Sequence, residues 1–251
     1  QDVMPGIKVD QGAKDLAGFP GEKITEGLGG LRERLAEYRD LGARFAKWRA
    51  VITIGENIPT PFCLEAYAHA LARYAALCQE ASIVPIVEPE VLMDGEHSIE
   101  RCEEVTRETL SLVFRALIAH RVHLPGILLK PNMVISGTGN ARQADVNEVA
   151  ERTLGVFHET VPSAVPGIVF LSGGQSDELA TAHLNRMNQI GGFPWKMSFS
   201  YGRALQAPAL KAWGGSEANR SAGQAAYLHR ARMNGAAAQG QYDASLEAAQ
   251  V

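Results

Sequence analysis

The 251-residue chain contains few cysteines and no long apolar run. Its three cysteines, Cys63, Cys78 and Cys102, cannot all pair with one another, and none belongs to a CxxC motif. This usage is typical of a reduced, cytoplasmic protein with buried thiols. No apolar stretch approaches the ~18–20 residues that a membrane-spanning helix needs, so we expect no association with a membrane.

The chain also lacks an excess of basic charge. It carries 24 Lys and Arg against 28 Asp and Glu, spread along its length, so we expect no nucleic-acid partner. None of its seven histidines forms an HxH or HExxH motif, so we expect no catalytic metal. Neither a GxGxxG nor a Walker motif is present, and we therefore expect no cofactor.

Short β-branched, apolar runs alternate with longer segments of helical period. The predicted strands are 6–10, 45–54, 84–91, 127–134, 167–174 and 195–202. Between them, 61–80, 144–160 and 176–190 have helical patterns, and Ser176 is a suitable N-cap. Another helix is indicated by an apolar stripe with steps of three or four residues: Ile99, Cys102, Thr106, Thr109, Val113 and Leu117. Such alternation predicts a parallel sheet covered by helices, either a barrel or a doubly wound sheet.

Polar residues recur in these strands at Lys8, Lys47, Glu88, Lys130 and Ser172, with gaps of 39, 41, 42 and 42 residues. These gaps match the length of one βα unit, so the residues are expected at comparable positions on successive strands. A TIM (β/α)8 barrel has eight strands. We interpret the chain as one barrel domain, 1–251, that shows strands 3–8. We expect about 100 residues before residue 1, and 206–251 is expected to form a C-terminal helical region and tail.

Charged residues inside strands are the most informative feature, because Lys and Glu are seldom buried without a partner or a function. Lys47 and Arg49 share one face of their strand, and Glu88 and Glu90 share one face of theirs. Lys130 ends a strongly apolar strand, at the end that is catalytic in barrels. Desolvation and a neighbouring cation favour a neutral lysine amine, which can attack a carbonyl. The alternative is a pair of structural ion pairs, Lys47–Glu88 and Arg49–Glu90.

A second group of residues follows the last two predicted strands. Ser172, Gly173 and Gly174 end one of them, and Ser200, Gly202 and Arg203 end the other. Glycines let backbone N–H groups approach an anion, and arginine adds a bidentate charge. In barrels, the loops after strands seven and eight commonly bind phosphate. The alternative is two tight turns that need glycine for steric reasons.

These motifs resemble the class I fructose-bisphosphate aldolases. The resemblance runs from residue 6 to about 242 and rests on GIKVD at 6–10, FAKWR at 45–49, IVEPE at 86–90, LLKPNM at 128–133, LSGGQS at 171–176, FSYGRALQ at 199–206 and LKAWGG at 210–215. It implies a barrel fold, a homotetramer, sugar-phosphate ligands and no metal. It also implies reversible cleavage of fructose 1,6-bisphosphate to dihydroxyacetone phosphate and glyceraldehyde 3-phosphate, a step of glycolysis and gluconeogenesis.

The resemblance also implies a role for each matching residue. Lys130 would form the Schiff base, Glu88 would shuttle protons, and Lys47, held by Glu90, would assist carbinolamine formation. Lys8 and Arg49 would lie toward the far phosphate of the substrate. The near phosphate would be bound by Ser172, Gly173, Gly174, Ser200, Gly202 and Arg203.

Two features of the family have no match in this sequence. They are an aspartate on the first barrel strand and, in the animal enzymes, a terminal tyrosine, to which Tyr242 is the nearest candidate. The competing hypotheses are another Schiff-base aldolase, of the deoxyribose-phosphate aldolase or transaldolase type, and a non-catalytic anion-binding or scaffolding homologue. The arrangement for two phosphates argues against the first. The second gains support only if the first-strand aspartate is missing or replaced.

Overall fold

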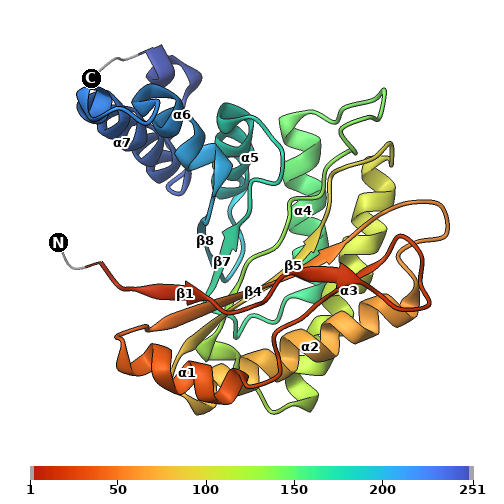
Figure 1. Ribbon diagram of the computed structural model, residues 1–251. Helices are drawn as coiled ribbons and strands as arrows, with labels where there is room; N and C mark the ends of the chain where they lie inside the picture. The colour runs from red at the N-terminus through yellow and green to blue at the C-terminus, as the bar shows by residue number, and fades with distance from the viewer. Residues whose placement is uncertain (1–2, 249–251) are drawn as a thin grey trace.

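A computed structural model describes residues 3–248 of the chain, which form a six-stranded parallel sheet covered by helices (Figure 1). The strand order is β1-β4-β5-β6-β7-β8, and β1 and β8 form the two edges. All six predicted strands are confirmed, β5 (Val84–Val91) with the predicted bounds and the others with shorter bounds: β1 (Gly6–Lys8), β4 (Phe45–Ile52), β6 (Leu128–Leu129), β7 (Gly167–Phe170) and β8 (Lys196–Phe199).

The strand β6 is much shorter than the predicted range 127–134 because side chains replace its ladder bonds. Pro131 has no backbone N–H to donate. Beyond it, the N–H of Val134 donates to Thr153 Oγ1 at 2.9 Å, and the N–H of Val91 on β5 donates to Asn132 Oδ1 at 3.0 Å. The backbone therefore continues the sheet without regular strand pairing.

Four long helices follow strands β4 to β7 in turn: α2 (Pro61–Glu80), α3 (Ile99–Ala119), α4 (Val146–Thr160) and α5 (Asp177–Ile190). Each begins at a residue whose side-chain oxygen accepts a hydrogen bond from a backbone N–H in the first turn: Thr60, Ser98, Asp145 and Ser176. The N-cap predicted at Ser176 is confirmed. So is the stripe of α3, since all six of its predicted residues are buried.

The two faces of β4 differ sharply in polarity. Ala46, Trp48 and Ile52 are completely buried, whereas Lys47 and Arg49 lie half-buried on the opposite face. The helix α2 packs against the apolar face, where Tyr74 donates its hydroxyl hydrogen to the carbonyl of Ala46 at 2.7 Å. The charged face of the sheet is thus turned away from the covering helices.

A small hairpin that was not predicted joins β1 to the next helix. Its strands, β2 (Ala13–Asp15) and β3 (Lys23–Thr25), pair antiparallel over three residues each. Such short strands give no apolar periodicity, which is why the sequence pattern did not indicate them. The helix that follows the hairpin is α1 (Leu31–Asp40), and the glycines at Gly27, Gly29 and Gly30 lie in the loop before it.

The chain ends in a helical hairpin beside the sheet (Figure 1). It consists of α6 (Arg203–Trp213) and α7 (Arg220–Ala237), with the short helices η2 (Glu217–Asn219) and η3 (Ala244–Ala248). A further short helix, η1 (Leu124–Gly126), precedes β6. The predicted tail extends to residue 251, and 249–251 lie outside the described residues. Within 3–248, no helix combines the length and apolarity needed to cross a bilayer.

Candidate active site

Three adjacent strands bring the predicted reactive groups together. Lys47 pairs in register with Lys8, whereas Glu88 pairs with Arg49, two residues farther along β4. Lys130 follows β6, and its N–H donates to the carbonyl of Val87 at 2.8 Å. The polar residues that recur about every 40 positions are therefore close together, but they are not all level with one another: Glu88 is displaced along the sheet by two residues relative to Lys47. Strands in a barrel are staggered in this way.

The carboxylate of Glu88 lies between two lysine amines. Its Oε2 is 2.6 Å from Lys47 Nζ, and its Oε1 is 3.1 Å from Lys130 Nζ. The side chains of Glu88 and Lys130 are only 4% and 10% exposed, against 21% for Lys47. A buried carboxylate that contacts two amines can transfer a proton to or from either one.

The surroundings of Lys130 favour its neutral form. Burial lowers the pKa of Lys130 below its ordinary value, the charge of Glu88 raises this pKa again, and the charge of Lys47 lowers it. Burial has the largest effect, so the net shift of the pKa is downward. The amine is thus more readily available as a nucleophile than that of an exposed lysine.

A second ion pair, between Arg49 and Glu90, lies beside the first. Its hydrogen bond raises the pKa of Arg49. The resemblance implied that Glu90 holds Lys47, but in the structure Glu90 binds Arg49, and Glu88 is the partner of Lys47. Each cation reaches a carboxylate two residues beyond its register partner on β5, so Lys47 contacts Glu88 and Arg49 contacts Glu90. The alternative interpretation predicted the ion pairs Lys47–Glu88 and Arg49–Glu90, and both are present. It did not include the contact between Lys130 and Glu88.

The buried carboxylate of Asp10 was not singled out from the sequence. Its Oδ1 lies 2.6 Å from Lys8 Nζ and accepts the N–H of Gly12 at 3.1 Å. Its Oδ2 accepts the N–H of Arg49 at 3.3 Å. Asp10 therefore orders the end of β1 and holds Lys8 near Arg49. An acidic residue at the end of a predicted strand that also contains a lysine was the available signal.

The two predicted anion-binding loops leave the sheet side by side, because β7 and β8 pair over their full lengths. The carbonyl of Phe170 accepts the N–H of Ser200 at 2.9 Å, which joins the ends of the two strands. Farther out, Arg203 donates from Nη2 to the carbonyl of Gly173. Ser172 is buried beneath the loop. The structure thus brings together the predicted residues of both loops.

The glycines of these loops differ in whether the backbone conformation or the available space requires glycine. Gly173 has a φ of +61°, and a Cβ atom there would lie 2.9 Å from Met93 Sδ, so the turn itself requires glycine. A Cβ atom on Gly174 would lie 3.3 Å from the same sulfur. Gly202 has a φ of −91°, and a Cβ atom there would meet nothing within 4 Å. Neither its φ nor a steric clash therefore requires glycine at Gly202.

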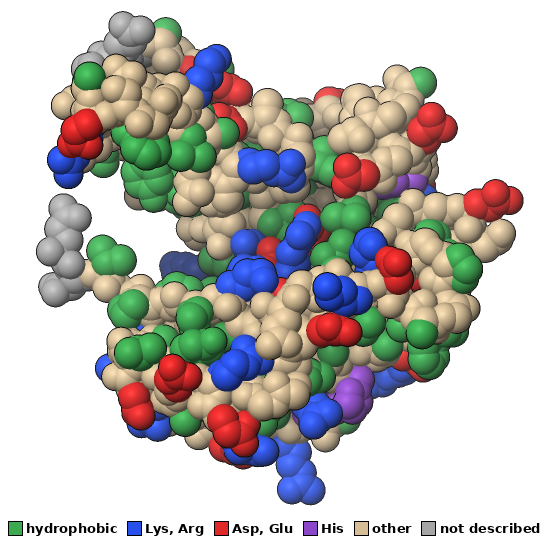
Figure 2. Space-filling view, viewed as in Figure 1, with side chains coloured by type: hydrophobic (Ala, Val, Ile, Leu, Met, Phe, Trp, Pro, Cys, Tyr) green, Lys and Arg blue, Asp and Glu red, His purple; other side chains and the backbone are tan. Residues whose placement is uncertain are grey.

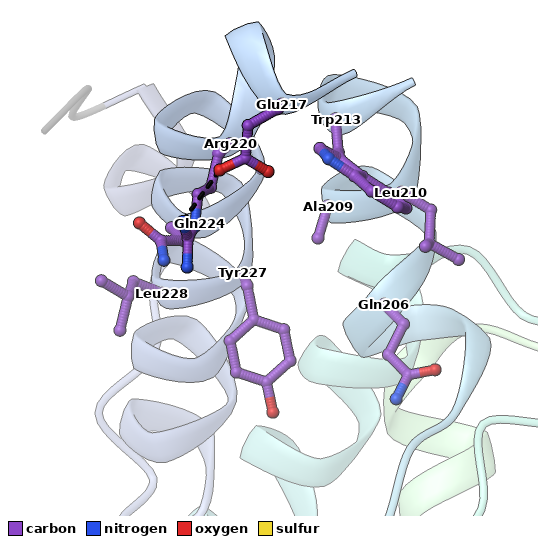
Figure 3. A pocket seen from close by; sticks show the side chains of 10 residues that line it. Gln206, Ala209, Leu210, Trp213, Glu217, Arg220, Gln224, Tyr227 and Leu228 are labelled. Carbon is purple, nitrogen blue, oxygen red and sulfur yellow. Dashed lines mark hydrogen bonds and ion pairs between the residues drawn. The ribbon is translucent and has the colours of Figure 1, made fainter. Parts of the chain in front are cut away.

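The molecular surface supports a charged site over the sheet. Figure 2 shows Lys and Arg side chains gathered around a hollow in the middle of this face. A separate hollow of about 840 Å³ lies between α6 and α7, where Trp213 and Tyr227 line it (Figure 3). Its charged residues include the ion pair Arg220–Glu217, and it contains no lysine. It therefore contains no lysine amine that could take the role predicted for Lys130.

Three further observations bear on the predictions. Within residues 3–248, no group of three His, Cys, Asp or Glu side chains is arranged to hold a metal ion. Tyr242 is buried at the end of the helical hairpin, where its hydroxyl donates to Glu247 Oε1 at 3.0 Å. The three cysteines are buried thiols, as predicted.

A family model for the glycolytic fructose-bisphosphate aldolases of class I matches residues 1–251. The chain belongs to the class I fructose-bisphosphate aldolase family. A probable fructose-bisphosphate aldolase class 1 from Xanthomonas campestris is 60% identical over 96% of this chain and 72% of its own length. The mouse fructose-bisphosphate aldolase B is 52% identical over 96% of this chain and 66% of its own length.

The aldolase fold is also confirmed by a solved structure. The fructose-bisphosphate aldolase of Plasmodium falciparum superposes with a TM-score of 0.94 and 48% identity, over 96% of this chain and 70% of that chain. The predicted fold class, family and lyase activity class are thereby confirmed. The roles of individual residues remain predictions that rest on the geometry described above.

Proposed function

We propose that this aldolase cleaves fructose 1,6-bisphosphate reversibly into dihydroxyacetone phosphate and glyceraldehyde 3-phosphate, through a Schiff base on Lys130. The observation that carries this proposal is the contact between the buried Lys130 amine and the Glu88 carboxylate at 3.1 Å. Transfer of one proton from the ammonium to the carboxylate leaves a neutral amine and a carboxylic acid. These are the nucleophile and the acid that the first step requires.

In the proposed reaction, Lys130 Nζ attacks the ketose carbon C2, and the carbinolamine loses water when Glu88 returns its proton to the departing hydroxyl. The resulting iminium withdraws the electron pair of the C3–C4 bond as that bond breaks. The C4 hydroxyl loses its proton to the Glu88 carboxylate and becomes the aldehyde of glyceraldehyde 3-phosphate. The same proton then passes to C3 of the enamine, and water hydrolyses the iminium to dihydroxyacetone phosphate.

We propose that the other charged residues hold and orient the substrate. Lys47 lies 2.6 Å from Glu88 and would stabilise its carboxylate during carbinolamine formation. Ser172, Gly173, Gly174, Ser200, Gly202 and Arg203 would bind the near phosphate, while Lys8 and Arg49 would bind the far one. Glu90, through its ion pair with Arg49, would fix the position of that guanidinium.

Further proposals concern the setting in which the enzyme acts. We propose a homotetramer in the cytoplasm that needs no metal and binds neither nucleic acid nor membrane. The cytoplasmic location is supported by the names of two Arabidopsis relatives, fructose-bisphosphate aldolases 4 and 6, which are described as cytosolic.

A cleavage assay on Lys130→Met tests the proposed function. Methionine has a similar length but no amine, so cleavage should fall by at least about 10⁴-fold, while inorganic phosphate still binds. The matched control is Lys196→Met, which removes an exposed lysine from the start of β8 and should retain activity. EDTA should leave the activity of the intact protein unchanged. Cleavage by Lys130→Met at the wild-type rate would refute the proposal.

A further inference from the structure

The loop after β7 is held by side chains that the proposed reaction does not use. The carbonyl of Ser172 accepts two hydrogen bonds from Gln175, one from its backbone N–H at 3.1 Å and one from Nε2 at 3.2 Å. The other end of the same amide, Oε1, lies 2.6 Å from Nδ1 of His183 on α5. His183 is only 2% exposed. A buried histidine is thus linked to the carbonyl of Ser172 through a single glutamine side chain.

These contacts determine where the protons lie. The Ser172 carbonyl can only accept, so the amide of Gln175 must direct its NH₂ group there and its oxygen toward His183. Nδ1 of His183 must therefore carry the proton that is donated to Oε1. Nε2 is buried without a hydrogen-bond partner among the described residues, and burial lowers the pKa of His183 to about 4. Near neutral pH, His183 is thus an uncharged donor.

The hydrogen bonds to Ser172 also orient the next N–H group. In a trans peptide, the C=O and the following N–H point in opposite directions. Because the Ser172 carbonyl is held toward Gln175, the N–H of Gly173 is directed away from Gln175. This N–H donates to no acceptor within residues 3–248, and the carbonyl of Gly173 is occupied by Arg203. The loop therefore presents a free, fixed donor beside a cation.

We infer that Gln175 and His183 are positioning residues, which direct the Gly173 N–H toward the near phosphate of the substrate. The inference rests on the proposed function, because it assigns a task to the loop proposed to bind that phosphate. Neither side chain touches the substrate in this arrangement. Gln175 acts through the Ser172–Gly173 peptide, and His183 acts through Gln175.

Gln175→Met tests the first link, because methionine has a similar volume but no amide. The probe is borohydride trapping of two ketones on Lys130: dihydroxyacetone phosphate, and dihydroxyacetone, which has the same carbonyl but no phosphate. We expect the half-saturating concentration of the phosphate ester to rise about tenfold, since a hydrogen bond to a charged group is affected. Trapping of dihydroxyacetone should be unchanged. In cleavage, the KM should rise more than the kcat falls.

A pair of substitutions at His183 tests the second link. Asparagine carries its amide nitrogen one bond from Cγ, as histidine carries Nδ1, so His183→Asn can still donate to Gln175. Leucine fills similar space without a donor. We expect His183→Leu to weaken trapping of the phosphate ester and His183→Asn to restore it. If His183 served only for packing, the order would be reversed, because leucine suits an apolar site better than an amide does.

The matched control is Gln189→Met, which removes a glutamine-to-carbonyl hydrogen bond of 3.3 Å, to Gly240, from the other end of α5. It should not change the trapping of either ketone. Equal loss with both ketones, or wild-type behaviour of His183→Leu, would overturn the inference. If Gln175→Met does not fold, the His183 pair decides. Failure of the wild-type protein to trap either ketone would instead refute the proposed function.

Discussion

At the scale of single residues, the site depends on an amine that is buried beside one carboxylate and one further cation. Burial favours the neutral form of Lys130, whereas Glu88 favours its charged form. Burial has the larger effect, but the carboxylate keeps the proton within reach at 3.1 Å. This balance is what a Schiff-base nucleophile needs, because the amine must lose its proton and the carbinolamine must then receive one.

The pH dependence of the reactivity of Lys130 follows from this balance. A lowered pKa means that the Lys130 amine becomes neutral at a lower pH than the amine of a free lysine side chain. Amine-specific labelling, followed by peptide mapping across a pH series, should therefore show that the Lys130 peptide reacts at a lower pH than a free lysine derivative added as the reference.

The substitution Glu88→Gln is the control for this experiment. It removes the charge that raises the pKa of Lys130, so the labelling curve should move to still lower pH, while cleavage falls by about 10²–10⁴-fold. A curve that moves to higher pH would contradict the assigned electrostatics.

At the scale of secondary-structure elements, the sequence predicted the parallel strands and the long helices correctly. Period-two and helical patterns located them, and capping residues such as Ser176 located helix starts. The hairpin β2–β3 gave no such pattern, and β6 ended early. The cause at β6 is tertiary: Thr153 and Asn132 take over hydrogen bonds that local sequence would assign to neighbouring strands.

A side chain replaces a strand-to-strand hydrogen bond beyond β6, so removing one hydroxyl there should destabilise the fold more than usual. Thr153→Val removes the only acceptor that the buried Val134 N–H has within residues 3–248, and it should lower the free energy of unfolding by about 1–3 kcal/mol. Urea denaturation would measure this change.

The control for Thr153→Val is Thr160→Val. The hydroxyl of Thr160 donates to the carbonyl of Val156, one turn earlier in the same helix, and it accepts from no backbone N–H in the described part of the chain. Its loss should cost less than about 1 kcal/mol. Equal effects of the two substitutions would argue against the role assigned to Thr153.

At the scale of the whole molecule, the site is assembled from residues far apart in the sequence. The 40-residue repeat predicted that the polar groups lie on successive strands, and the sheet brings Lys47, Glu88 and Lys130 into contact. The ion pair of Arg49 with Glu90 was named only in the alternative interpretation, and the contact of Asp10 with Lys8 was not predicted, because both depend on the stagger of the strands. His183 was likewise missed, since its link to the loop passes through Gln175 and leaves no local pattern.

The two proposed phosphate sites occupy different strands, so they can be tested separately. Arg203 lies at the loops after β7 and β8, whereas Lys8 lies on β1. We expect Arg203→Met to raise two quantities by about tenfold or more: the half-saturating concentration for trapping of dihydroxyacetone phosphate, and the KM for cleavage of fructose 1,6-bisphosphate. Lys8→Met should raise only the KM for the bisphosphate. Weakened trapping of the triose phosphate by Lys8→Met would contradict the assignment.

The most direct test of the central claim is to identify the lysine that becomes covalently attached to substrate. The intact protein would be incubated with dihydroxyacetone phosphate, reduced with borohydride, digested and mapped by mass spectrometry. The account predicts one three-carbon phosphate adduct, on the peptide that contains Lys130. An adduct on Lys47 alone, or no adduct on a folded and substrate-saturated protein, would contradict it.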